Sequence, residues 1–219
     1  MTLQEKLDAF KADFEANKAP RAAVEAFHRS TQDLIDSGQA DRAKKTGDVA
    51  PDFTLTDSEG NDVVLKDLLA KGPVVLTFYR GVWCPYCNLD LKALEEVADE
   101  IRQRGATLVA VSMQGATDSQ RSRRVNKLSF PILTDQGGAL AEAFGLRWAL
   151  QPYVKEFFQG FGVVLPTIHG DGEWNLPMPA RYVIAKDGTI AYAEVNPDYT
   201  RRPEPSELFP VLDRLASAT

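Results

Sequence analysis

The two cysteines of this chain are the residues whose type and spacing most clearly predict chemistry. Cys84 and Cys87 are the only cysteines among 219 residues, and they enclose a Pro-Tyr dipeptide. Two thiols at this spacing can close an intramolecular disulfide. In a chain that has no other cysteine, the pair indicates redox chemistry more than structural cross-linking.

The histidines do not extend the cysteine pair into a metal site. Zinc takes four ligands, and the chain can add only His28, in a predicted N-terminal helix, and His169, in a turn far along the chain. We expect His169 to be exposed to solvent and not to act as a general base. The sequence therefore predicts neither a metal nor another cofactor.

The elements around the motif place the first cysteine at the start of a helix. Residues 73–79 form a continuous apolar run, as expected for a strand buried on both faces, and residues 89–101 carry an apolar stripe with helical spacing. A thiolate at a helix start faces unpaired N–H groups and the positive end of the helix dipole. Pro85 suits the first helical turn. We therefore expect Cys84 to be exposed and activated, and Cys87 to be more buried and to resolve the oxidised state.

The rest of the chain alternates between strands and helices and predicts an α/β fold around a central mixed sheet. Further strands are expected at 51–57, 62–65, 107–112 and 130–134, and a hairpin at 181–185 and 188–193. Further helices are expected at 137–144, 150–159 and 204–217.

Residues 1–38 predict two helices ahead of this sheet. An apolar stripe from Leu3 to Phe14 is interrupted at Pro20, resumes at Val24, and ends before Gly38. A polar linker follows at 39–48. We therefore predict an N-terminal helical extension over 1–45 and an α/β domain over 46–219.

Composition excludes several classes of partner. Apolar residues make up 44% of the chain and charged residues 26%, and 25 Lys and Arg against 31 Asp and Glu give a net charge of −6. This acidic balance disfavours nucleic acid and anionic membrane surfaces as general partners. The first residues contain no apolar leader, and no run is long enough to span a membrane. We expect a cytoplasmic protein.

Three segments of the chain resemble a known family. Residues 50–53 (Ala-Pro-Asp-Phe), 77–87 around the cysteines and 130–135 (Phe-Pro-Ile-Leu-Thr-Asp) are similar to those of the peroxiredoxin-like branch of the alkyl hydroperoxide reductase and thiol-specific antioxidant (AhpC/TSA) family. The resemblance covers about 46–216. It implies a thioredoxin fold and a thiol-dependent peroxidase that reduces hydrogen peroxide or alkyl hydroperoxides. It also implies recycling by thioredoxin or glutathione, and a homodimer.

The site departs from the family pattern in its first half. Peroxiredoxins resemble one another in a Pro-x-x-x-Thr/Ser-x-x-Cys loop. Here Arg80 stands at the proline position, Cys84 stands at the threonine position, and Cys87 matches the attacking cysteine. The helix-start argument favours attack by Cys84 and the alignment favours Cys87. Both remain open, and we favour Cys84.

The family pattern also contains a distant arginine. Alignment of residues 182–184 with the family's strand puts Pro179 at that position, where it looks like the cis-proline of thioredoxins. Arg181 lies two residues further on and is a weak substitute. The segment 196–202 reads as a turn and helix cap, with an arginine near the site as a second interpretation.

Three residues beside the cysteines are expected to support the site. Arg80 is close enough to stabilise a thiolate or a polarised peroxide oxygen, although a solvated loop position explains it equally well. Trp83 is expected to form an apolar wall over the disulfide, and Tyr86 to be partly exposed and to shape the pocket.

Two other functions compete with the peroxidase. Cys-Pro-Tyr-Cys is typical of glutaredoxins, so the alternative is a thioredoxin- or glutaredoxin-like disulfide oxidoreductase without significant peroxidase activity. A third interpretation is a redox-sensing binding module in which the disulfide alters a partner surface on the N-terminal helices.

Overall fold

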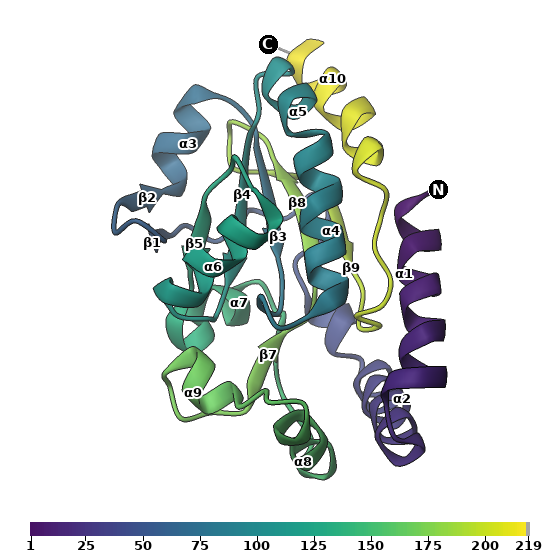
Figure 1. The fold of residues 1–219 in the computed structure, drawn as a ribbon. Helices are drawn as coiled ribbons and strands as arrows, with labels where there is room; N and C mark the ends of the chain where they lie inside the picture. Colours follow the sequence, from purple (N-terminus) through teal and green to yellow (C-terminus); the bar gives the residue numbers. More distant parts are fainter. Residues whose placement is uncertain (218–219) are drawn as a thin grey trace.

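A seven-stranded mixed sheet forms the centre of the computed structural model, which describes residues 1–217 (Figure 1). The strand order is β2-β1-β5-β4-β3-β8-β9, with β3, β4 and β5 parallel and their neighbours antiparallel. The strands are β1 (Thr54–Asp57), β2 (Asp62–Val64), β3 (Val74–Phe78), β4 (Thr107–Ser112), β5 (Ile132–Thr134), β8 (Ala180–Ile184) and β9 (Ile190–Val195). A separate two-stranded ribbon pairs β6 (Arg147–Ala149) with β7 (Asn175–Pro177).

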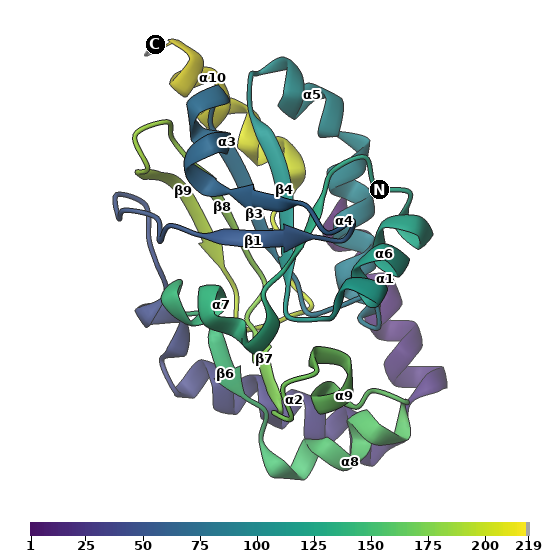
Figure 2. The ribbon, with the colours of Figure 1, turned by 90° about the vertical axis from the view of Figure 1, so that its left-hand side faces the viewer.

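Helices cover both faces of the sheet (Figures 1 and 2). One face packs against α1 (Leu3–Asp13), α4 (Pro85–Glu96), α5 (Ala98–Gln103) and α10 (Phe209–Ser217), and the other against α3 (Leu65–Lys71) and α7 (Ala139–Ala143). The remaining helical segments are η1 (Phe14–Lys18), α2 (Arg21–Asp36), η2 (Gln39–Arg42), α6 (Ala116–Asn126), η3 (Gln136–Gly138), α8 (Pro152–Gly160), α9 (Leu165–His169) and η4 (Pro205–Leu208).

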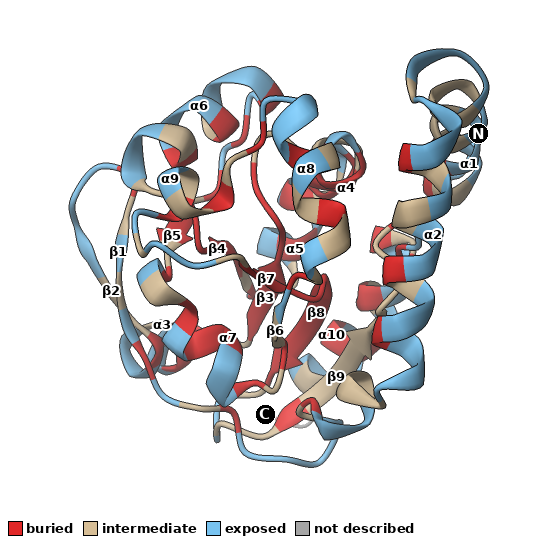
Figure 3. Ribbon diagram, turned by 90° about the horizontal axis from the view of Figure 1, so that it is seen from below, coloured by how far each residue is buried: buried red, intermediate tan, exposed pale blue. Residues whose placement is uncertain are grey.

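Alternation along β3 explains the two layers. Val74, Leu76 and Phe78 belong to the core cluster on one face, whereas Val75 and Tyr79 belong to the cluster on the other face. All five residues of β3 are buried, because helices lie over both sides. Figure 3 shows this buried centre of the sheet enclosed by elements with exposed outer surfaces.

The predicted α/β arrangement and the strands at 73–79, 107–112 and 130–134 are confirmed, as is the hairpin of β8 and β9. The helix expected over 89–101 is two helices, because the backbone leaves helical geometry at Val97 (φ −115°, ψ 7°). The second strand stops at Val64, where α3 begins. The ribbon of β6 and β7 and the helix α9 were not expected.

The two predicted N-terminal helices are present and pack against the sheet domain. Leu3 and Leu7 of α1 are buried in the same core cluster as α4 and α10. The backbone N–H of Leu3 donates to Glu204 Oε1 at 2.6 Å, which ties the start of the chain to its C-terminal part. The boundary at residue 45 stays a prediction. Within 1–217, the helices are too short or too polar to cross a membrane.

Candidate active site

The cysteine pair lies where the loop after β3 enters α4. Cys84 is the N-cap of α4, and Pro85 occupies the first helical turn, as predicted. The preceding loop is held through Val82. Its N–H donates to Gln114 Oε1 at 2.9 Å, and its carbonyl accepts from Asn88 Nδ2 at 2.7 Å. These bonds fix the loop to the residues after β4 and to α4, so the first thiol is held in a set position.

Both cysteines are free thiols and both are buried. Cys84 is 1% exposed and Cys87 is 0% exposed. The prediction that Cys84 is exposed is therefore wrong. The physical reason is that aromatic side chains from elements distant in the sequence cover the start of α4, which an argument from local helix geometry cannot anticipate.

The two thiols have opposite electrostatic surroundings. Burial by itself raises the pKa of Cys84, but a hydrogen bond from Cys87 and the charges of Arg80 and Arg202 outweigh it and lower the pKa to about 6. The pKa of Cys87 is raised well above its usual value. Burial is the main cause, and the hydrogen bond to Cys84 and the negative charge of Cys84 add to it. At neutral pH the site therefore holds its thiolate on Cys84.

Charged side chains behind the cysteines form a buried network. Arg202 Nη2 lies 3.6 Å from Cys87 Sγ, and Arg202 Nε lies 3.3 Å from Asp90 Oδ2. Asp90 also pairs with Arg181, which donates from Nη1 to the carbonyl of Pro203 at 3.1 Å. Asp90 lies one helical turn after Cys87 on the inner face of α4. Its carboxylate pairs with two buried guanidinium groups, which lie behind the thiols.

The N-terminal helix α1 holds the segment that carries Arg202. Gln4 Nε2 donates to the carbonyl of Thr200 at 3.3 Å, and Gln4 Oε1 accepts from the backbone N–H of Arg202 at 3.2 Å. Arg202 Nη1 folds back onto the carbonyl of Tyr199 at 2.8 Å. The position of this guanidinium group therefore depends on contact with the start of the chain.

An aromatic cavity of about 230 Å³ opens in front of Cys84. Cys84 lines this cavity and Cys87 does not. Its apolar wall comes from the N-terminal helices, from the loop after β3 with the start of α4, and from the region of α8, with one ring from the C-terminal segment: Phe10, Phe14, Phe27, Trp83, Tyr86, Phe158, Phe161, Val163 and Tyr199. Arg80 is the one charged side chain among the residues that line it.

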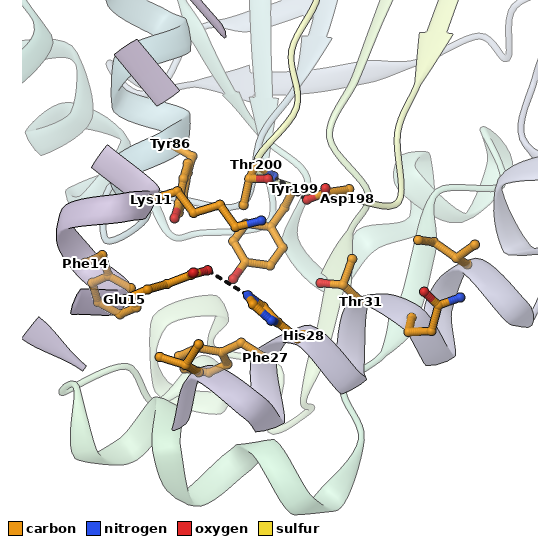
Figure 4. Close-up of a pocket in the computed structure, with 13 residues that line it drawn as sticks. Lys11, Phe14, Glu15, Phe27, His28, Thr31, Tyr86, Asp198, Tyr199 and Thr200 are labelled. Atoms are coloured by element: carbon orange, nitrogen blue, oxygen red, sulfur yellow. Dashed lines mark hydrogen bonds and ion pairs between the residues drawn. The ribbon is translucent and has the colours of Figure 1, made fainter. Parts of the chain in front are cut away.

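A second, more polar cavity of about 190 Å³ lies next to the first (Figure 4). The two share Phe14, Phe27, Tyr86 and Tyr199. His28 Nε2 and Glu15 Oε1 are 2.6 Å apart across the polar cavity, and this pair joins η1 to α2 (Figure 4). Two of the shared rings, Phe14 and Phe27, therefore belong to a braced pair of helical segments.

Arg80 and Trp83, which the sequence placed beside the site, both line the aromatic cavity. Arg80 is only 5% exposed, so the solvated-loop interpretation is wrong. Its guanidinium carbon lies 4.1 Å from the ring centre of Tyr199, 4.9 Å from that of Trp83 and 5.6 Å from that of Phe158. Rings around the cation replace water as its surroundings.

Tyr86 and His169 are both buried, against expectation. Tyr86 is 6% exposed because Phe10 and Tyr199 pack edge-on against its ring, with ring centres 5.1 and 5.4 Å away. His169 is 0% exposed at the end of α9, and burial lowers its pKa.

Pro179 does not provide the expected thioredoxin-like feature. The described part of the chain contains no cis peptide bond, so Pro179 is trans and the predicted cis-proline is wrong. Its carbonyl accepts from the N–H of Asn196 at 3.3 Å, which continues the β8–β9 ladder by one residue. Arg181 pairs with Asp90 and donates to the carbonyl of Pro203, and not to the cysteines. The arginine that reaches a sulfur is Arg202, from the segment that the sequence read mainly as a turn.

Several site residues were not identified from the sequence. Asp90 had a usable signal, because an acidic residue on the apolar face of a helix requires a buried partner. Phe10, Phe14 and Phe27 lie in helical stripes that an ordinary core would explain equally well. Their place opposite Cys84 follows from tertiary packing.

The AhpC/TSA family model matches residues 46–193. Rv1608c of Mycobacterium tuberculosis (strain ATCC 25618 / H37Rv), provisionally named a peroxiredoxin, is 33% identical over 106 residues, or 48% of this chain and 69% of the relative. Peroxiredoxin Bcp of Escherichia coli (strain K12) is 27% identical over 129 residues, or 59% of this chain and 81% of the relative.

A solved structure shows the same fold. The crystal structure of peroxidoxin BcpB from Mycobacterium tuberculosis superposes with a TM-score of 0.62 at 23% identity, and the match covers 80% of this chain and 98% of that one. The expected thioredoxin fold is therefore confirmed. Phe10, Phe14, Phe27, Tyr199 and Arg202 all lie outside the 46–193 match to the family model.

Proposed function

This chain belongs to the AhpC/TSA family, and from that premise we propose that it is a thiol-dependent peroxidase whose attacking group is Cys84. The observation that carries the assignment of the attacking residue is the asymmetry of the pair. Cys84 has the lowered pKa and lines the cavity, whereas Cys87 lies behind it with a raised pKa. The thiolate is the nucleophilic form of a cysteine, so only Cys84 is both charged and reachable by a small molecule.

In the first step, the Cys84 thiolate attacks the terminal oxygen of a hydroperoxide. An S–O bond forms, the O–O bond breaks, and the alcohol or water leaves after taking up a proton, so that Cys84 becomes a sulfenic acid. The sulfur is oxidised and the peroxide is reduced. Arg80 is the charged group in the cavity wall, where it can stabilise the negative charge on the departing oxygen.

In the second step, Cys87 attacks the sulfenic acid, an S–S bond forms, and water leaves. The charge of Cys84, which raises the pKa of Cys87 in the reduced protein, is absent once Cys84 is a neutral sulfenic acid. Arg202 remains 3.6 Å from Cys87 Sγ and favours its thiolate. Arg80 and Arg202 thus stabilise the thiolate of Cys84 in the first step and that of Cys87 in the second.

Two thiols of an external reductant then return both cysteines to the reduced form and become a disulfide themselves. A small thiol can enter the cavity and reach Cys84. A protein reductant cannot bring its own thiol against Cys84, because this residue is only 1% exposed. We therefore propose a small thiol, such as glutathione, ahead of thioredoxin. A cytoplasmic location and a homodimer stay predictions.

Stopped-flow fluorescence tests this function, because Trp83 adjoins the cysteines. Pre-reduced protein is mixed with one equivalent of hydrogen peroxide, and Cys84→Ser and Cys87→Ser are measured beside it. We expect oxidation much faster than for a free thiol of the same pKa, no rapid phase in Cys84→Ser, and a trapped sulfenic acid in Cys87→Ser.

Oxidation no faster than that of a free thiol would contradict the peroxidase. The protein would then be a disulfide oxidoreductase on a peroxiredoxin scaffold. A rapid phase that survives in Cys84→Ser would instead make Cys87 the attacking residue.

A further inference from the structure

We infer that the aromatic cavity selects hydroperoxides with an apolar body of about the size of a benzene ring over hydrogen peroxide. The selecting residues include three phenylalanines from the N-terminal helices. This inference rests on the proposed peroxidase and specifies its substrate class. Phe10, Phe14 and Phe27 precede the segment that the family model matches, so this wall is an addition to the shared fold.

The size of the cavity sets the size of the ligand. An enclosed apolar cavity of about 150 Å³ in a protein core stays dry and binds benzene. The cavity in front of Cys84 measures about 230 Å³ and is lined mainly by aromatic rings. It therefore has room for a substituted benzene ring. Hydrogen peroxide fills little of this space and buries no apolar surface in it.

Two parts of the cavity wall have different chemistry. In one, the Cys84 sulfur lies near Arg80, whose Nε is buried without a hydrogen-bond partner. The other consists of the rings of Phe14, Phe27 and Phe161, with ring centres 5.6 Å apart for Phe14–Phe161 and 6.0 Å apart for Phe27–Phe161. A ligand with a polar –OOH group and an apolar body matches both parts. Its peroxide oxygens would face the thiolate and the cation, and its body would lie among the rings.

The position of Phe161 indicates how such a ligand enters. Phe161 is 42% exposed, which is unusual for a phenylalanine that also contacts two other rings. It lies just beyond the C-terminal end of α8, before Gly162, and its ring joins α8 to the N-terminal helices. The half-exposed ring of Phe161 therefore lies at the outer rim of the cavity, which is partly open to solvent.

The test compares two peroxides and one alcohol. Second-order rate constants for cumene hydroperoxide and hydrogen peroxide are measured by stopped flow, and binding of 2-phenyl-2-propanol, the alcohol product, by calorimetry. Val163→Phe fills the cavity from within its wall, and Phe161→Ala removes the half-exposed ring. Phe209→Ala is the matched control, because Phe209 is a partly buried aromatic on α10 that does not line the cavity.

We expect the wild-type protein to bind the alcohol and to prefer cumene hydroperoxide. The ratio of the two rate constants should fall about tenfold or more in Val163→Phe, since lost apolar contacts in a pocket discriminate by such factors. Phe161→Ala should weaken alcohol binding. The variant should still fold, because Phe161 is half-exposed. Phe209→Ala should keep the wild-type ratio.

The test distinguishes failure of the proposed peroxidase activity from failure of the inferred selectivity. If neither peroxide reacts faster than with a free thiol, the proposed function fails, and alcohol binding then reports on the cavity alone. If the protein reacts rapidly with both peroxides but binds no alcohol, or keeps the same ratio in Val163→Phe, the inference about selectivity is overturned and the peroxidase stands.

Discussion

The two sides of the Cys84 sulfur differ in almost every physical property. Behind the cysteine pair, Arg202, Asp90 and Arg181 form a buried ionic network. In front, phenylalanine, tyrosine and tryptophan rings line a cavity of about 230 Å³. Arg202 on the charged side and Arg80 in the aromatic wall both favour the Cys84 thiolate. The rings determine what can reach that thiolate, so reactivity depends on the cations and selectivity on the rings.

Both sides depend on parts of the chain that the family model does not match. The N-terminal helices contribute three rings to the aromatic side, and Gln4 of α1 holds the backbone that carries Arg202 on the charged side. The matched segment supplies the sheet, the cysteines, Arg80 and Asp90. The shared fold therefore provides the thiol pair, and the flanking segments complete both of its surroundings.

The largest effect is expected from Asp90→Asn, which removes the carboxylate that pairs with both Arg181 and Arg202. Removal of one partner from a buried ion pair costs about 3–5 kcal/mol. Urea denaturation measures this loss in the free energy of unfolding. The matched control is Asp99→Asn on the neighbouring helix α5, where the carboxylate is 80% exposed and should change stability by less than about 1 kcal/mol. Equal effects in the two variants would contradict the network.

Arg202→Gln tests the contribution of the charged side to reactivity. Without this cation the pKa of Cys84 rises above about 6, because one of the charges that favours its thiolate is gone. At pH 6.5 we expect peroxide oxidation to slow by about threefold or more, since loss of a nearby opposite charge raises a pKa by about 1–3 and lowers the thiolate fraction. Arg201→Gln changes the exposed neighbouring arginine and should leave the rate unchanged. An unaltered rate in Arg202→Gln would show that Arg202 does not contribute to the reactivity of Cys84.

The depressed pKa of Cys84 also predicts how stability varies with pH. The thiol titrates near pH 6 in the folded protein and near 8.5 in the unfolded chain, so between these values the unfolded chain binds more protons. Stability from this group is present in full above about pH 8.5 and is lost as the pH falls towards 6. We expect the melting temperature of the reduced protein to rise from pH 7 to pH 8.

We choose pH 7 to 8 because two other buried groups affect stability outside this range. Burial lowers the pKa of His169, so its effect on stability lies below pH 7, and the raised pKa of Cys87 acts in the opposite direction at higher pH. Cys84→Ser should therefore abolish the rise between pH 7 and pH 8. A rise that persists in this variant would assign it to another group.

The smallest effect is expected from Gln4→Ala, which loosens the segment of Arg202 without removing a charge. Two hydrogen bonds to the backbone of Thr200 and Arg202 are lost, and Arg202 keeps its contact with Asp90. We expect a rise of a few tenths in the pKa of Cys84, measured from the pH dependence of thiolate absorbance. Gln103→Ala on the exposed surface of α5 is the control. A pKa identical to that of the control would mean that α1 does not position the charged side.

The fold was predictable from the sequence because its strongest signals are local. The apolar run at 73–79 and the strand at 107–112 lie at the observed positions of β3 and β4, and Pro85 marked the first turn of α4. The surroundings of the thiols were not predictable in the same way. Arg202 reaches Cys87 across 115 positions, and Phe27 meets Phe158 from another helix, so neither contact leaves a pattern in the local sequence.

Site-resolved alkylation of the reduced protein tests the central claim most directly. Limiting iodoacetamide is added across pH 5 to 9, and mass spectrometry measures the fraction of carbamidomethyl on each cysteine. The account predicts that Cys84 is modified first, with a midpoint near pH 6, and that Cys87 stays unmodified at neutral pH. Faster modification of Cys87 at neutral pH would contradict it and would assign the thiolate to the residue that contacts Arg202.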